Sequence, residues 1–226
     1  MSPVLLVFAK VPRPGDVKTR LTPVLSPEAA AHLYDAFLRD ALALYSELAV
    51  DVRLYLAPPL PDRGIEGMPT QVSVHEQQGD GLGPRMQHAF HEVFRAGYER
   101  AVIVGTDHPT LPPSFIQRAL NVLKTPGTIT IGPSEDGGFY LLGMNDFYPH
   151  LFERMTYSHD EVFADTRARA EATEAQVLIL PEWYDVDTPS ALRRLLDDLD
   201  DADVQVPRTR TAVRELSLRT QLSLDD

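Results

Sequence analysis

A lone carboxylate, that of Asp107, follows a short apolar run at a point where ligand-binding loops begin in α/β proteins. The run, Val102 to Val104, is β-branched and predicts a buried strand that ends at Gly105. A carboxylate there, in a loop stiffened by three prolines, suits a hard divalent cation that also holds phosphate oxygens. The alternative is that Asp107 caps the helix expected from Pro113.

Two further carboxylates, Asp185 and Asp187, follow the last expected strand in the segment Tyr-Asp-Val-Asp-Thr-Pro. Either one could instead cap the helix that begins at Thr188 or Pro189. Magnesium usually takes one or two protein carboxylates and completes its octahedron with water and phosphate oxygens. Asp107 with Asp187 fits that count, so the sequence predicts Mg²⁺ or Mn²⁺ between them and a bound diphosphate.

The loop after the first expected strand is cationic although the chain is acidic. Four cations lie within eleven residues: Lys10, Arg13, Lys18 and Arg20. Gly15 permits a close backbone approach, and prolines reduce the entropy that the loop loses on gripping a ligand. We therefore expect a phosphate-binding loop, with a solvated basic surface as the alternative. The loop is neither a Walker A motif nor a dinucleotide-binding G-x-G-x-x-G.

A second glycine-rich loop, residues 75–90, leads into a helix whose free N–H groups could face a ligand. Gln77 and Gln78 could read a base edge, and we place Gln78 in the expected nucleotide site. Arg85 could reach phosphate. For the glutamines taken alone, a hairpin-like turn followed by a helix start is the favoured explanation.

Two other polar residues are candidates for chemistry at the acceptor or the metal. Asp136 precedes paired glycines that would let an acceptor approach, and it could act as a general base toward an acceptor hydroxyl. An acidic turn before an edge strand is the alternative for Asp136. His108 could add a metal ligand or contact phosphate, although a loop histidine beside proline is commonly just exposed.

The composition narrows the classes of protein. The chain has 226 residues, with 21 Lys and Arg against 33 Asp and Glu, and a net charge of −12. This charge argues against nucleic acid as a partner, since proteins that bind it present basic surfaces. Absence of cysteine excludes disulfides, thiolate catalysis and Cys-ligated zinc. No signal peptide and no apolar run of about 20 residues is present, so we expect a cytoplasmic protein that does not enter the membrane.

Strands and helices alternate along the sequence, which predicts one three-layer α/β domain over residues 1–200 with a mostly parallel sheet. Expected strands are 4–9, 52–56, 72–74, 102–104, 128–131, 139–142 and 177–180. Expected helices are 29–48 with Ser26 as N-cap, 86–94, 113–123, two segments within 147–172, and 188–199. The glycine-bounded strand at 139–142 should lie outside the simple βαβ order. Residues 201–226 are expected to form a surface helix or a tail.

Five motifs occur in an order that resembles a known family. They are A-K-V-P-R-P-G-D-V-K-T-R-L-T-P, Q-G-D-G-L-G-P-R-M, G-T-D-H-P-T-L-P, G-P-S-E-D-G-G-F-Y-L-L-G and D-V-D-T-P-S-A-L. The chain resembles the small bacterial glycosyltransferase-like proteins of GT-A fold in the nucleotide-diphospho-sugar transferase superfamily. More distantly, three motifs are similar to those of 2-phospho-L-lactate guanylyltransferase and the molybdenum cofactor guanylyltransferases.

The resemblance implies a Rossmann-like GT-A sheet, a nucleotide or nucleotide sugar over its N-terminal half, and a divalent metal at Asp107. Asp187 matches the second acidic position of nucleotidyltransferases. The family resemblance as a whole favours metal-dependent transfer of a sugar from a nucleotide sugar to a small acceptor. One departure favours nucleotidyl transfer from a nucleoside triphosphate instead, because the glycosyltransferase motif D-x-D is replaced by Thr106-Asp107-His108. A third possibility is a nucleotide-binding protein without catalysis.

Overall fold

The sheet that organises the molecule is mixed but mostly parallel. A computed structural model describes residues 2–60, 65, 67–157 and 159–223. In the described part of the chain, seven strands form one sheet in the order β3 (Ser73–Glu76), β2 (Asp51–Leu56), β1 (Pro3–Ala9), β4 (Arg100–Val104), β6 (Phe139–Met144), β5 (Thr128–Pro133) and β7 (Gln176–Ile179). Only β6 runs antiparallel to its neighbours, β4 and β5. The predicted α/β class and the irregular placement of 139–142 are thus confirmed.

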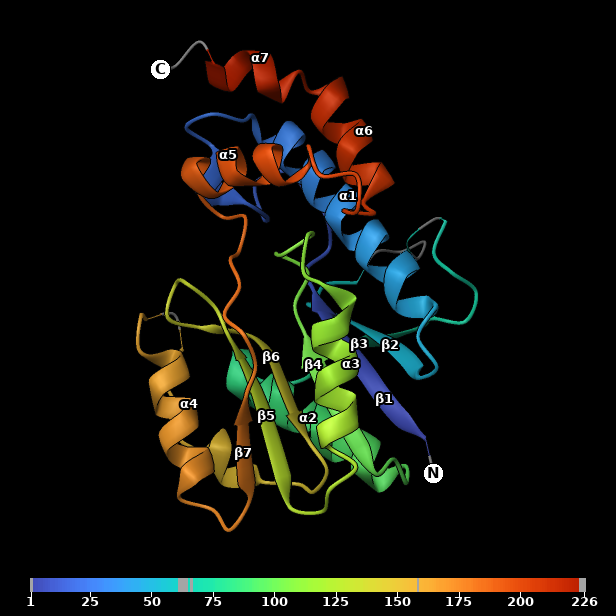
Figure 1. Cartoon of the computed structure of the whole chain (residues 1–226), viewed down its shortest axis with the longest axis vertical. Helices are drawn as coiled ribbons and strands as arrows, with labels where there is room; N and C mark the ends of the chain where they lie inside the picture. Colours follow the sequence, from blue (N-terminus) through green and yellow to red (C-terminus); the bar gives the residue numbers. More distant parts are fainter. Residues whose placement is uncertain (1, 61–64, 66, 158, 224–226) are drawn as a thin grey trace.

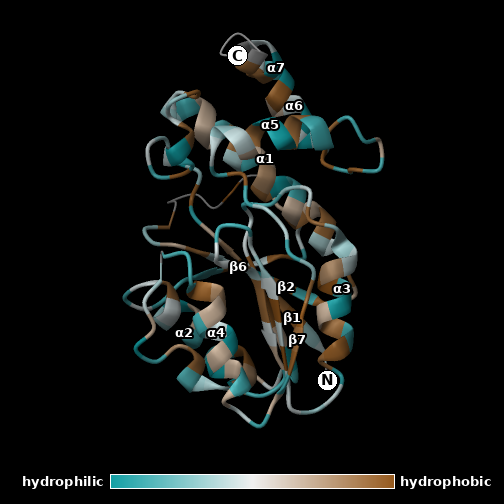
Figure 2. Ribbon diagram, turned by 60° about the vertical axis from the view of Figure 1, so that its left-hand side comes forward, coloured by the Kyte–Doolittle hydropathy of each residue, from teal (hydrophilic) through white to brown (hydrophobic). Residues whose placement is uncertain are grey.

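Alternation along the central strands explains why helices cover both faces. In β1, Leu5 and Val7 face one apolar cluster while Leu6 and Phe8 face another. The first cluster includes α1 (Pro27–Ser46) and α3 (Pro113–Val122), and the second includes α2 (Leu82–Arg95) and α4 (Val162–Glu171). Figure 2 shows the hydrophobic strands enclosed between α2 and α4 on one side and α3 on the other. This three-layer arrangement is the one predicted.

A third apolar cluster lies beyond the carboxyl ends of the strands. It joins the first half of α1 to α5 (Pro189–Asp198), α6 (Pro207–Glu215) and α7 (Leu218–Ser223), as the upper part of Figure 1 shows. Ala212, Val213 and Leu218 are buried there. The segment expected as a surface helix or tail therefore forms two helices with buried inner faces, and residues 224–226 lie outside the described residues.

The ends of α1 and α5 follow the sequence signals. Ser26 accepts a hydrogen bond from the N–H of Ala29, and Thr188 accepts one from Ala191. Two expectations are wrong in detail. The helix expected at 86 begins at Leu82, and the first of the two segments within 147–172 is only the 3₁₀ turn η2 (Pro149–Leu151). Among the described helices, none is both long and apolar enough to cross a membrane.

Candidate functional site

The candidate site lies where the sheet changes its winding direction. From β1 the chain proceeds to β2 and β3 on one side and then returns to β4 on the other. Ligands in open α/β sheets bind at the carboxyl ends of strands flanking such a switch point. The loops that follow β1 and β4 meet there, and the segment after β7 joins them through the hydrogen bond from Val186 N to Asp107 O, 2.8 Å long.

At the centre of these loops, one ammonium group holds two carboxylates. Lys18 Nζ donates to Oδ1 of Asp107 and to Oδ1 of Asp187, the latter at 2.8 Å. The Lys18 side chain is 1% exposed, and its Nζ lies 5.6 and 5.5 Å from the ring centroids of Tyr34 and Phe37. Burial alone would lower the pKa of Lys18, but the charges of Asp107 and Asp187 raise it well above its ordinary value. Lys18 therefore stays charged at any physiological pH.

This arrangement corrects two expectations. Lys18 was predicted to bind phosphate from its loop, yet its side chain is buried and already paired with two carboxylates. Its backbone has a left-handed conformation, with φ 50°, immediately before the 3₁₀ turn η1 (Thr19–Leu21), and this directs the chain into the site. Asp107 does not cap α3, because Pro112 is the N-cap residue and no side chain accepts from the helix there.

The neighbours of Asp107 are tied to the scaffold. The Thr106 hydroxyl is hydrogen-bonded to the Tyr34 hydroxyl at 2.9 Å, and Tyr34 also accepts from the backbone N–H of Lys10. Burial, with a contribution from Asp107, raises the pKa of Tyr34 to about 12, so it remains a neutral phenol. On the other side, His108 is 4% exposed and faces Asp185, so it is neither exposed nor turned toward Asp107. Asp107 thus presents the only carboxylate of its loop.

Beside the pair lies a cavity of about 540 Å³, which we call the large cavity. Of the predicted nucleotide-site residues, it is lined by Lys10, Lys18, Arg20 and Arg85, together with both carboxylates. Arg85 Nε donates to Gly79 O at 3.1 Å. Apolar side chains including Phe8, Leu82 and Met86 supply other walls. The large cavity therefore combines cationic and apolar surfaces, as a nucleotide requires.

Three predicted residues lie apart from this cavity. Arg13 donates to Pro59 O at 3.0 Å, Gly15 (φ +85°) has open space around it, and Gln78 is exposed. None of the three lines the large cavity. Gln77 lines it instead, and its amide donates to Ala9 O and Tyr55 O. These two hydrogen bonds hold Gln77 at the cavity, whereas Gln78, the next residue, is exposed.

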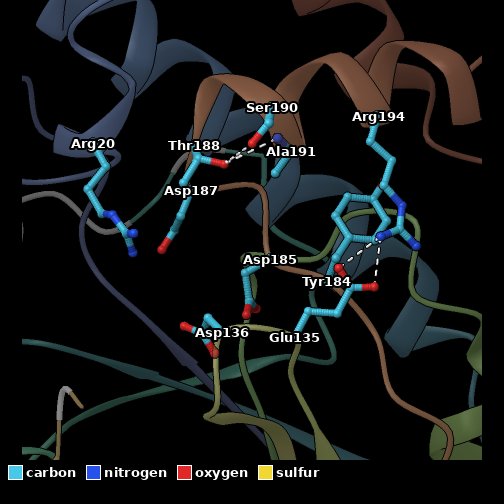
Figure 3. Close-up of a pocket in the computed structure, with 10 residues that line it drawn as sticks. All are labelled: Arg20, Glu135, Asp136, Tyr184, Asp185, Asp187, Thr188, Ser190, Ala191 and Arg194. Carbon is cyan, nitrogen blue, oxygen red and sulfur yellow. Dashed lines mark hydrogen bonds and ion pairs between the residues drawn. The ribbon is translucent and has the colours of Figure 1, made fainter. Parts of the chain in front are cut away.

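A second, small cavity of about 340 Å³ adjoins the first, and Arg20 and Asp187 line both. Figure 3 shows the carboxylates of Asp136, Asp185 and Asp187 around the same space, with Arg20 directed toward it. Asp136 accepts from the N–H of Gly138 at 2.9 Å, so its carboxylate is held by its own turn. Within the described residues, Arg20 has no hydrogen bond or ion pair.

Sequence reasoning missed an interacting group in the small cavity, formed by Glu135, Tyr184 and Arg194. Arg194 Nη1 lies 2.8 and 3.0 Å from the two Glu135 oxygens, and its guanidinium lies 3.9 Å from the centroid of the Tyr184 ring. Glu135 and Arg194 are 59 residues apart. No local pattern relates them, because the contact exists only once α5 packs beside the turn after β5.

The donor set at the carboxylate pair fits a divalent cation completed by substrate. Asp107 and Asp187 already converge on one positive charge, and their side chains are 44% and 35% exposed. Across the described ranges, no three His, Cys, Asp or Glu side chains group as a metal site. Two carboxylates alone are the count expected for a magnesium-type ion that takes its other oxygens from phosphate and water.

Comparisons with known proteins agree with this fold. The family model described as "Uncharacterized protein conserved in bacteria (DUF2064)" matches residues 41–159. A crystal structure from Desulfovibrio desulfuricans G20, of a protein assigned as a nucleotide-diphospho-sugar transferase, superposes with a TM-score of 0.90. It is 33% identical, over 99% of this chain and 98% of that chain. No curated protein matches the sequence.

More distant structures share the fold alone. The inositol-1-phosphate CTP transferase from T. maritima has a TM-score of 0.52 and 14% identity, over 89% of this chain and 97% of that chain. Rv0371c from Mycobacterium tuberculosis H37Rv has a TM-score of 0.51 and 19% identity, over 87% of this chain and 98% of that chain. The predicted resemblance to the nucleotide-diphospho-sugar transferase superfamily is confirmed.

Proposed function

The chain belongs to the DUF2064 family and has the nucleotide-diphospho-sugar transferase fold, and on that premise we propose a transferase that takes a nucleoside phosphate donor and a divalent cation. The observation that carries this proposal is the junction of the two cavities. Asp187 and Arg20 line both of them, and Lys18 links Asp187 to Asp107 at the same place. Group transfer between two bound substrates requires such a shared boundary.

The large cavity is our proposed nucleotide site. Lys10, Arg20 and Arg85 provide positive charge for phosphates in a chain whose net charge is −12. Leu82, 46% exposed, gives an apolar surface against which a base can pack. Mg²⁺ or Mn²⁺ held by Asp107 and Asp187 would offset the charge on the phosphate oxygens during transfer.

The small cavity is our proposed site for the second substrate. Arg20 stands at its boundary with the large cavity and is free to receive an anionic group. Asp136 faces the same space and could accept a proton from a hydroxyl. A phosphate nucleophile needs no such base, because it is largely deprotonated at pH 7.

The geometry favours nucleotidyl transfer over glycosyl transfer. The loop after β4 offers one carboxylate, Asp107, because its neighbours are Thr106 and His108, whose side chains bind Tyr34 and Asp185. The second carboxylate, Asp187, comes from beyond β7. This spacing supports the nucleotidyltransferase alternative, although the sequence resemblance favoured sugar transfer. In the proposed reaction, an oxygen of the second substrate's phosphate bonds to the α-phosphorus of a nucleoside triphosphate. The α–β P–O bond breaks, and pyrophosphate leaves.

Glycosyl transfer remains the second candidate because of the 33%-identical transferase from D. desulfuricans. In that reaction a hydroxyl of the acceptor bonds to the anomeric carbon, its proton passes to Asp136, and an intact nucleoside diphosphate leaves. The released phosphorus species therefore separates the two candidates.

The test uses ³¹P NMR on two sets of mixtures containing Mn²⁺ or Mg²⁺. One set holds nucleoside triphosphates with sugar phosphates, and the other holds nucleotide sugars with free sugars. We expect pyrophosphate from the first set, with Asp107→Asn at least 100-fold slower, a loss of turnover far larger than its loss of stability. Nucleoside diphosphate from the second set would establish glycosyl transfer. Nucleotide binding without any product in either set would indicate a binding protein.

A further inference from the structure

A buried contact between His108 and Asp185 joins the two segments that present the carboxylate pair. His108 directly follows Asp107, and Asp185 lies two residues before Asp187. The Nδ1 atom of His108 is 3.4 Å from Oδ1 of Asp185, and the two side chains are 2% and 16% exposed. Since a carboxylate only accepts, Nδ1 carries the hydrogen in this contact.

Asp185 is held from a second direction as well. Its other oxygen, Oδ2, accepts from the hydroxyl of Ser134, in the turn after β5. Asp185 is therefore a fixed carboxylate whose two oxygens tie separate loops together.

The remaining polar atom of the imidazole has no role elsewhere. His108 Nε2 is buried without a hydrogen-bond partner among the described residues, and the ring centroids of His108 and Tyr140 are 5.5 Å apart. The only polar contact that the His108 ring makes in the described structure is thus the one to Asp185. The polar role of the His108 side chain is therefore its contact with Asp185.

We propose that His108 and Asp185 are positioning residues that set the separation of Asp107 and Asp187 for a divalent cation. This inference rests on the proposed function. The backbone bond from Val186 N to Asp107 O fixes the two segments at one point. The His108–Asp185 contact adds a second point, and two points prevent one segment from pivoting against the other. A site that relies on two protein carboxylates depends strongly on their spacing, because no third ligand corrects it.

Two substitutions at His108 separate the contact from the bulk of the side chain. In His108→Asn the amide nitrogen takes the place of Nδ1 and can still donate to Asp185. In His108→Gln the amide nitrogen takes the place of Nε2, and the donor toward Asp185 is lost. The control is Thr110→Val. It removes the hydrogen bond between the Thr110 and Tyr184 hydroxyls and the one from Thr110 to Asp198, but leaves His108 and Asp185 intact.

The measurement is water proton relaxation enhancement by Mn²⁺ in the presence of ATP, GTP, CTP or UTP, titrated with protein. We expect the half-saturating protein concentration to rise about 10-fold in His108→Gln, in line with the loss of an outer hydrogen-bond partner of a metal site. His108→Asn and Thr110→Val should stay within about threefold of the unmodified protein. Asp185→Asn, which can accept only one of its two hydrogen bonds, serves as a second loss variant if His108→Gln does not fold.

The outcomes are distinguishable. Absence of enhancement in the unmodified protein with all four nucleotides would overturn the proposed function and this inference with it. Normal Mn²⁺ binding in both His108→Gln and Asp185→Asn would overturn the positioning role alone. Equal weakening in Thr110→Val would also overturn it, because any loosening of the two segments would then suffice.

Discussion

Lys18 Nζ lies 2.8 Å from Oδ1 of Asp187, although 169 residues separate the two in the chain. The same ammonium binds Asp107, so the positive charge that the sequence suggested for phosphate instead offsets part of the charge of the two proposed metal ligands. A divalent cation bound here would therefore share these carboxylates with Lys18, and this relationship leads to the first two predictions.

Substitution of Lys18 should mainly lower stability, whereas substitution of Arg20 should mainly lower nucleotide affinity. We expect Lys18→Met to lower the free energy of unfolding by about 1–3 kcal/mol, because it leaves Asp107 and Asp187 facing each other, and their exposure limits the loss. Arg20→Ala should change stability by less than about 0.5 kcal/mol. Its nucleotide affinity should fall about 10-fold or more. Urea unfolding and calorimetric titration measure the two quantities, and a destabilised Arg20→Ala with normal affinity would contradict the assignment.

A divalent cation should bind the carboxylate pair only together with a nucleotide. Two carboxylates that already share the positive charge of Lys18 give weak affinity, and phosphate oxygens supply the missing ligands. Calorimetric titration with Mg²⁺ or Mn²⁺, with and without nucleotide, measures this dependence. Unchanged tight binding in the Asp107→Ala, Asp187→Ala double variant would place the metal elsewhere.

Asp40 should anchor the C-terminal helices. Its carboxylate, 1% exposed, lies in α1 and accepts from the N–H groups of Arg208 and Thr209 at 3.1 and 2.7 Å. It therefore caps α6 from another helix, and Asp40→Ala should cost about 2–3 kcal/mol. Asp40→Asn keeps one acceptor and should cost less. Denaturant unfolding provides the numbers, and a neutral Asp40→Ala would show that apolar packing alone holds α6.

Gly137 should be intolerant of a side chain. Its φ is +87°, and a Cβ there would overlap the carbonyl group of Asp160. Gly137→Ala should cost about 3 kcal/mol or more and disturb the adjacent Asp136 turn. Gly127→Ala is the matched control, since its φ is +66° but nothing lies within 4 Å of the added carbon. It should cost about 1–2 kcal/mol. Similar losses of stability in Gly137→Ala and Gly127→Ala would mean that the backbone at Asp160 moves aside at little cost.

His75 should make stability depend on pH. Burial first, and then the positive charge of Arg53, lower the pKa of His75, while Glu92 and Asp51 oppose this. The unfolded chain therefore takes up a proton more readily, so stability should fall as the pH decreases below about 6.5. His75→Phe keeps the ring stacked on Tyr55, whose centroid is 4.9 Å away, and should flatten the profile between pH 7 and 5. Unfolding free energies of both proteins, measured across that range, test this prediction. Parallel pH profiles for the unmodified protein and His75→Phe would show that other groups cause the dependence.

Local sequence signals accounted for the framework of this protein. Apolar alternation in β1, the Ser26 and Thr188 caps, and glycines around β6 act over a few residues, so the chain alone predicts them. The placement of Asp107 and Asp187 at one edge also follows from sequence, because carboxyl ends of parallel strands share an edge.

Side-chain partnership was decided by tertiary structure. Nothing in the local sequence marks Lys18 as the partner of Asp187, Asp185 as that of His108, or Asp40 as the cap of α6. Each contact joins segments whose proximity depends on how α1, α5 and the sheet pack, and burial then determines whether a charge remains free or must be paired. The sequence by itself determined which residues gather at this edge of the sheet. Only the packed fold decided which of them bind each other and which, like Arg20, line a cavity without a side-chain partner among the described residues.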